Sequence, residues 1–116
     1  MRVKVTPAVK AELIQGYTGL QDSGRYAFDD DIGFDRMEAV LAKLEATKDG
    51  FVELDGAEAK DMIEEVESRI EIVAENALFY AGWREKRNVS ERATTAECRS
   101  LLRWLYKLRD DLRANS

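Results

Sequence analysis

Two stretches in the second half of the chain repeat apolar residues at alternating spacings of three and four positions. Such a repeat places the apolar side chains on one stripe of an α-helix, and the stripe has to be buried against another helix. Two seams joined by a short connection predict an antiparallel helical hairpin, which constrains the fold more than any other feature. The seams are Ile63, Val66, Ile70, Val73, Ala77 and Tyr80 in the first stretch, and Cys98, Leu101, Leu105, Leu108 and Leu112 in the second.

The ends of these two helices carry capping signals. The first helix is predicted from Ala57 to about Lys86, because Asp55-Gly56-Ala57-Glu58 has the spacing of a capping box. The second is predicted to end near Leu112, with either Ser90 or Thr94 as its N-cap.

The first half of the chain contains signals for two further helices. Thr6 and Pro7 are typical of a helix start, so one helix is predicted from Pro7 to about Gln15, with Gly16 as its left-handed stop. Residues 17–33 contain several glycines and no helical stripe, which predicts an irregular loop pinned to the core by its aromatic residues. The next helix is predicted to have Asp35 as its N-cap, and its apolar stripe consists of Met37, Val40, Leu41 and Leu44.

Short alternating segments precede two of the four helices. Val3 and Val5 alternate with a lysine, and Val52 and Leu54 alternate with a glutamate. They can pair as two strands with one buried face, or they can be extended loop segments, because alternation this brief does not decide between the two. The sequence therefore predicts a mainly α fold of about four helices, with a long C-terminal hairpin and room for a small two-stranded sheet.

Length and composition favour a single cytoplasmic domain over residues 1–116. A chain of 116 residues can bury a core without disulfides, and 45% hydrophobic with 35% charged residues is typical of a folded soluble protein. No apolar run approaches the ~20 residues that cross a bilayer, so no membrane partner is expected. A single cysteine, Cys98, suits a reducing compartment.

Several chemistries are disfavoured by the residues that the chain lacks. It has no histidine and one cysteine, so a zinc site and the usual general base are both missing. No glycine-rich phosphate loop is present. Placing Asp29 at the first position of a calcium loop puts Phe34 where glycine is required and Val40 where glutamate is required. We therefore expect a non-catalytic protein with no cofactor and no metal.

The charge of the chain is unevenly distributed. Residues 1–83 contain nine Lys or Arg against eighteen Asp or Glu, whereas residues 84–116 contain nine against five. Much of this split is explained if the acidic third helix packs beside the basic fourth helix. Packing of these two helices does not account for the acidic loop within "YAFDDDIGFD". This loop carries the candidate protein-binding residues Asp29, Asp30, Asp31 and Asp35.

These observations favour an interaction protein. The leading hypothesis is a small non-catalytic protein-binding module, an inhibitor or adaptor, that presents an acidic surface to a basic patch of a partner protein; a phage-type inhibitor of a nucleic-acid-processing defence enzyme is one such protein. The second-choice acidic surface is Glu64, Glu67, Glu71 and Glu75. A nucleic-acid-binding protein is a disfavoured alternative, because the sequence pI is about 4.9, and its candidate residues are Arg84, Lys86, Arg87, Arg92 and Arg99. A structural homodimer is the third reading.

Overall fold

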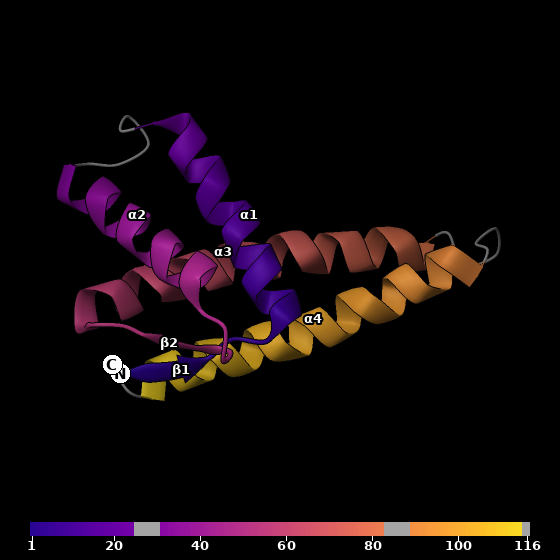
Figure 1. Ribbon diagram of the computed structural model, residues 1–116. Coiled ribbons are helices and arrows are strands. Elements are labelled where there is room, and N and C mark those ends of the chain that lie inside the picture. The colour runs from indigo at the N-terminus through magenta and orange to yellow at the C-terminus, as the bar shows by residue number, and fades with distance from the viewer. Residues whose placement is uncertain (25–30, 83–88, 115–116) are drawn as a thin grey trace.

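The computed structural model describes residues 1–24, 31–82 and 89–114, and it describes side chains within 1–24, 31–77 and 96–114. Four helices and two strands follow one another in the chain (Figure 1). The fold is mainly helical with a small sheet, as predicted. In order, the elements are β1 (Arg2–Lys4), α1 (Pro7–Ser23), α2 (Asp31–Ala46), β2 (Phe51–Glu53), α3 (Gly56–Gly82) and α4 (Val89–Ala114).

Helices α3 and α4 form the predicted long hairpin and lie side by side over much of their length (Figure 1). Most of the predicted seam is buried: Val66, Ile70, Val73, Leu105, Leu108 and Leu112. The start of the first seam was predicted one position too late, because Met62 is fully buried whereas Ile63 is only partly buried. The early turns of α3 pack against α1 and α2 as well as α4, which moves the buried stripe toward Met62.

The prediction that the first helix stops at Gly16 is wrong. Helix α1 begins at the Thr6 N-cap, whose hydroxyl accepts a 3.3 Å hydrogen bond from the Val9 N–H, and continues to Ser23. Its C-cap is Gly24, with a φ of 76° that favours glycine. Val9, Leu13 and Tyr17 recur every four residues and are all buried, so packing outweighs the ~1 kcal/mol that an internal glycine costs.

The predicted start of the second helix is also wrong. Helix α2 begins at Asp31, so Asp35 lies in its second turn and is not the N-cap. The reason is Phe34, which is buried and extends the predicted stripe of α2 by one turn toward the N-terminus. The loop predicted over residues 17–33 is therefore replaced by helix at both ends, and residues 25–30 lie outside the described residues.

The two short strands pair, which decides between the two alternatives that the sequence left open. β1 and β2 are antiparallel, with Val3 opposite Val52 and both side chains buried. The capping box that follows β2 is confirmed. The Glu58 N–H donates to Asp55 Oδ1 at 2.8 Å, and the Asp55 N–H donates to Glu58 Oε1 at 3.0 Å. Lys43 of α2 also donates to Glu58 Oε1 at 2.7 Å, so this buried carboxylate joins two helices.

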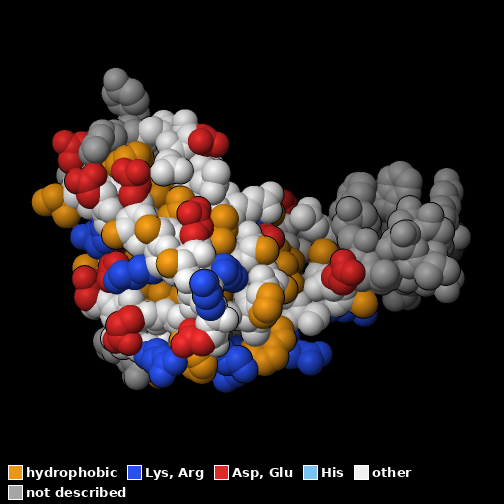
Figure 2. Space-filling view, in the orientation of Figure 1, with side chains coloured by type: hydrophobic (Ala, Val, Ile, Leu, Met, Phe, Trp, Pro, Cys, Tyr) orange, Lys and Arg blue, Asp and Glu red, His pale blue; other side chains and the backbone are white. Residues whose placement is uncertain are grey.

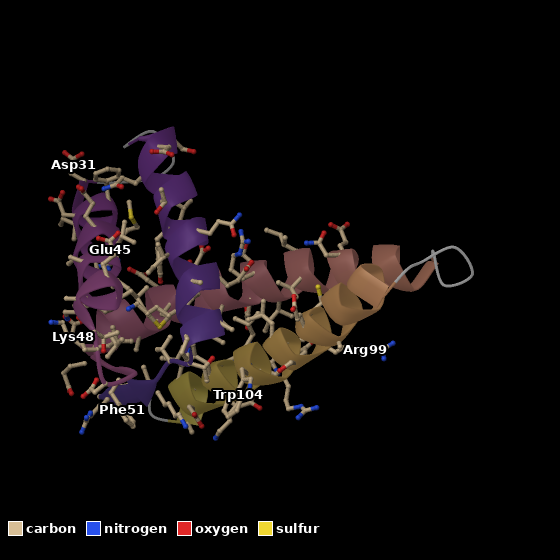
Figure 3. All side chains as sticks on the ribbon, turned by 45° about the vertical axis from the view of Figure 1, so that its right-hand side comes forward. Asp31, Glu45, Lys48, Phe51, Arg99 and Trp104 are labelled. Carbon is tan, nitrogen blue, oxygen red and sulfur yellow. The ribbon has the colours of Figure 1, made fainter. Side chains whose placement is uncertain are left out.

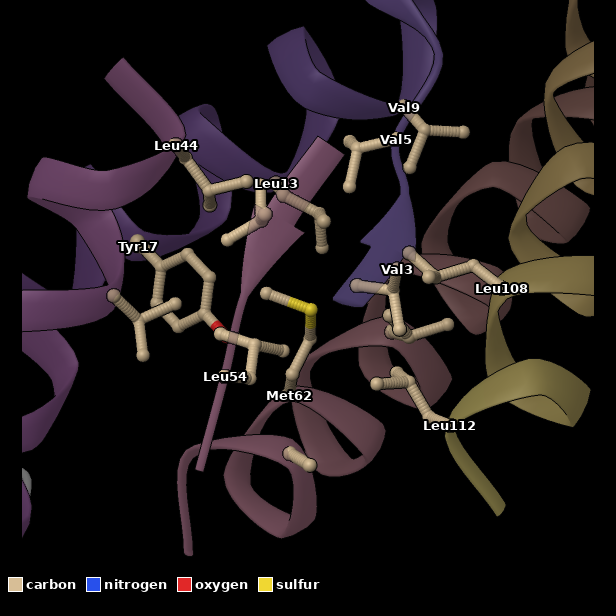
Figure 4. Packing of buried hydrophobic residues seen from close by; sticks show 14 of the residues in the cluster. Val3, Val5, Val9, Leu13, Tyr17, Leu44, Leu54, Met62, Leu108 and Leu112 are labelled. Atoms are coloured by element: carbon tan, nitrogen blue, oxygen red, sulfur yellow. The ribbon is translucent and has the colours of Figure 1, made fainter. Parts of the chain in front are cut away.

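One hydrophobic core joins the hairpin to the rest of the chain. Side chains from β1, α1, α2, α3 and α4 meet in it (Figure 4). The Tyr17 hydroxyl is buried there without a hydrogen-bond partner among the described residues, and burial raises the pKa of Tyr17 above its usual range. Within the described part of the chain, each helix lacks the length or the apolar content needed to cross a membrane.

Candidate protein-binding site

The end of the molecule where α1 finishes and α2 begins carries exposed carboxylates. Asp31, which is labelled in Figure 3, and Asp35 are both exposed on the first two turns of α2. Asp22 is exposed on the last turn of α1. Glu38, one turn further along α2, is half-buried. We call Asp22, Asp31, Ile32, Asp35 and Glu38 the acidic tip.

Ile32 is the residue that the sequence interpretation missed. Its side chain is 69% exposed, the highest value among the exposed large hydrophobic residues of the described chain. A helix that begins at Asp31 places Ile32 off the buried stripe defined by Phe34 and Met37, so the side chain points away from the core. The signal was available in the helical periodicity, but only after the helix start had been placed correctly.

The acidic tip is held to the core by contacts on the opposite side of α2. Phe34 and Met37 are buried, and Arg36 forms an ion pair with Asp61 of α3. Gln21 of α1 donates to Glu38 Oε2 at 3.2 Å, which links the two helices near the tip. The carboxylates of Asp31 and Asp35 are therefore carried by a helix that is anchored to the core before any partner arrives.

Only part of the predicted acidic loop can be placed. The structure brings Asp31 and Asp35 together on adjacent turns of α2, whereas Asp29 and Asp30 lie outside the described residues. Asp31 is in the first turn of the helix, where a negative charge gains about 0.3–1 kcal/mol from the helix dipole. That gain accounts for one carboxylate at the tip.

The second-choice acidic surface follows the outer face of α3. Glu64, Glu71 and Glu75 are exposed, whereas Glu67 forms an ion pair with Arg113 of α4. That pair supports the prediction that the charge split is partly absorbed inside the hairpin. Ile72 of α3 is 39% exposed, whereas Ile32 at the acidic tip is 69% exposed. The outer face of α3 therefore offers a less exposed isoleucine than the acidic tip does.

Most of the residues predicted for nucleic-acid binding have side chains that the structure does not describe. Arg84, Lys86 and Arg87 lie outside the described residues, as does the side chain of Arg92. Arg99 is exposed on α4.

Among the described residues, no group of three or more His, Cys, Asp or Glu side chains is placed to hold a metal ion. The one thiol, Cys98, is partly buried and packs against the core. Burial, and then the nearby Glu97 and Glu12 carboxylates, raise the pKa of Cys98, which disfavours the thiolate needed for nucleophilic chemistry.

No protein-family model, curated protein sequence or solved structure matches this chain.

Proposed function

We propose that this chain is a small non-catalytic protein-binding module, an inhibitor or adaptor, that presents its acidic tip to a basic patch of a partner protein. The observation that carries the proposal is the exposure of Ile32 on the same two turns of α2 that carry the exposed carboxylates of Asp31 and Asp35. Figure 2 shows acidic side chains gathered around hydrophobic surface at this end of the molecule.

An exposed apolar side chain with charged neighbours has the anatomy of a binding site. Protein interfaces bury an apolar centre and keep a polar rim in contact with water. Ile32 supplies the centre, and Asp31, Asp35 and Asp22 supply the rim. Full burial of an isoleucine side chain is worth about 1.5–3 kcal/mol, and 69% of that surface is available here. Ile32 can therefore contribute about 1–2 kcal/mol of binding free energy, which is roughly 5- to 30-fold in Kd.

The carboxylates of the tip favour a partner that carries arginine or lysine at its surface. Charge complementarity accelerates association and fixes orientation, and a fixed array loses less entropy on binding than a floppy tail does. Basic grooves that accept nucleic acid present this chemistry, so the class that we propose includes inhibitors of nucleic-acid-processing enzymes, such as phage inhibitors of bacterial defence. The single cysteine of the chain fits a cytoplasmic setting for this interaction.

The test begins with purification of the protein from its native cells and identification of the co-purifying protein by mass spectrometry. Binding is then measured with the purified partner. Ile32→Ser is expected to weaken binding by about 5- to 30-fold through faster dissociation. Asp31→Asn with Asp35→Asn is expected to weaken it by at least about tenfold through slower association at low salt.

Glu64→Gln with Glu75→Gln is the matched control, because it removes the same number of exposed carboxylates from α3. If the α3 variant loses binding while both tip variants bind like the parent, the acidic surface is on α3 and our assignment is wrong. Light scattering of the isolated protein addresses the homodimer alternative.

A further inference from the structure

A row of basic side chains follows the outer face of α4. Arg99, Arg103 and Lys107 are spaced four residues apart, and all three are exposed. The rise of an α-helix places successive members about 6 Å apart along the axis. Lys4 of β1 continues the row, because Lys4 and Lys107 line one shallow hollow together with Trp104. We call Lys4, Arg99, Arg103 and Lys107 the cationic row.

The fold leaves most of this positive charge uncompensated. Arg99, Arg103 and Lys4 form no ion pair with any residue that the structure describes, whereas Lys107 forms an ion pair with Asp111 one turn further along α4, at 3.8 Å. The basic side chains that hold the fold together behave differently. Arg36, Lys43, Arg69 and Arg113 each pair with a carboxylate on another helix. Three of the four residues of the cationic row, Lys4, Arg99 and Arg103, therefore take no part in the ion pairs within the described chain.

Aromatic side chains accompany the row. Trp104 is partly buried against the core, and the Lys4 ammonium lies 5.6 Å from the centre of its ring. Tyr106 is 41% exposed one helical position before Lys107. Figure 3 shows Arg99 and Trp104 on α4 at the edge of the molecule remote from Asp31. Along the lower edge in Figure 2, basic and hydrophobic side chains lie close together on the surface, with acidic side chains among them on the left.

We propose that the cationic row and Trp104 form a binding site for single-stranded nucleic acid. Guanidinium and ammonium groups at regular intervals track a phosphate backbone, and an aromatic ring gives a base a face on which to stack. A single strand is favoured over a duplex because the row is short and the chain carries a net charge of -5, without the broad basic footprint that duplex binding requires. The acidic tip does not prevent binding, because charges beyond about 8 Å are largely screened at physiological salt.

This site is separate from the acidic tip and does not depend on the function proposed for it. The test is fluorescence anisotropy with the whole protein and a labelled dT oligonucleotide of about twelve nucleotides, at 50 and 200 mM salt. Three to four phosphate contacts predict a slope of about -2 to -3 in log K against log salt. The affinity is then expected to fall by about 20- to 50-fold between the two salt concentrations.

Three variants identify the residues responsible. Arg103→Gln is expected to reduce the salt slope by about 0.7, since it removes one phosphate contact. Trp104→Leu is expected to weaken binding by at least about fivefold with no change in the slope, because stacking releases no counterions. Lys60→Gln is the control, because Lys60 is an exposed lysine of α3 outside the row, and it is expected to change neither quantity.

Circular dichroism of each variant separates loss of binding from loss of folding. Should Trp104→Leu fail to fold, Arg99→Gln with Arg103→Gln replaces it, because both positions are exposed and the pair is expected to weaken binding by at least tenfold. The proposal is overturned if no binding is measured at 50 mM salt, or if Arg103→Gln and Lys60→Gln bind alike. It is also overturned if polyglutamate of equal charge displaces the oligonucleotide as well as unlabelled dT does, which would assign the row to an acidic peptide.

Discussion

Two glycines inside α1 respond to the same substitution to different degrees. Gly16 and Gly19 both have helical backbone, so alanine at either position gains the difference in helix propensity, about 0.5–1 kcal/mol. A Cβ at Gly19 meets no atom within 4 Å. A Cβ at Gly16 would overlap the Glu65 carboxylate of α3 and lie 3.0 Å from Cδ of Arg69. The comparison therefore measures how closely α1 approaches α3.

The magnitudes follow from these surroundings. Gly19→Ala is expected to stabilise the protein by about 0.5–1 kcal/mol, which is roughly 2–4 °C in Tm for a chain of this length. Gly16→Ala gains the same amount but has to displace the carboxylate end of the flexible Glu65 side chain, which offsets most of that gain. We expect Gly16→Ala to be less stabilising than Gly19→Ala by about 1 kcal/mol.

Urea unfolding of the two single variants and of Gly16→Ala/Glu65→Ala provides the assay. Removing the Glu65 side chain makes room for the new methyl group, so the double variant is expected to recover about 1 kcal/mol relative to the sum of the single changes. Equal stabilisation by Gly16→Ala and Gly19→Ala would refute the close approach of α1 to α3. Destabilisation by Gly19→Ala would show that α1 ends before this residue.

Three further outcomes test the core, a cap and a buried charge. Leu105→Asp is expected to abolish the helical circular dichroism signal, because it places a charge at a fully buried position at a cost of several kcal/mol. Glu58→Ala is expected to lower the free energy of unfolding in urea by about 1–2 kcal/mol, since the side chain caps α3 and pairs with Lys43. Burial, and then the Glu12 carboxylate, raise the pKa of Glu65, against the opposing effect of Arg69, so the folded state binds this proton more tightly than the unfolded chain does. Stability is therefore lost as the pH rises above the ordinary value of 4.5, and Glu65→Gln is expected to raise Tm at pH 7 but to leave it unchanged at pH 4.

The elements that the sequence predicted correctly are those whose signals are local or strongly periodic. The capping box from Asp55 to Glu58 involves one turn, and its hydrogen bonds form as its spacing indicates. The α3–α4 hairpin follows from a repeat sustained over several turns, which packing reinforces at every step. The pairing of Val3 with Val52 was left open because it joins residues about fifty positions apart, and short alternation carries no information about the partner strand.

The errors arose where tertiary packing overrides a local signal. The low helix propensity of glycine predicts that α1 ends at Gly16, but burial of Tyr17 one residue later favours continuation of the helix. The same reasoning applies to Phe34, which extends α2 past the expected Asp35 cap. Placing the start of α2 at Asp35 also left Ile32 out of the predicted site, because Ile32 is an exposed helical residue only when α2 begins at Asp31.

The packing of α4 against β1 has a consequence for how the protein is made. Leu108 and Leu112 complete the core around Val3, which is near the start of the chain (Figure 4). A two-stranded sheet is not stable alone, and β1 gains part of its support only after α4 has been synthesised. At 5–20 residues per second, a ribosome needs roughly 5–20 s to travel from the codon for Val3 to the codon for Leu112. During that interval the apolar residues of β1 and α1 lack part of their final cover, and nascent chains stalled before α4 are expected to be cut by proteases that leave the finished protein intact.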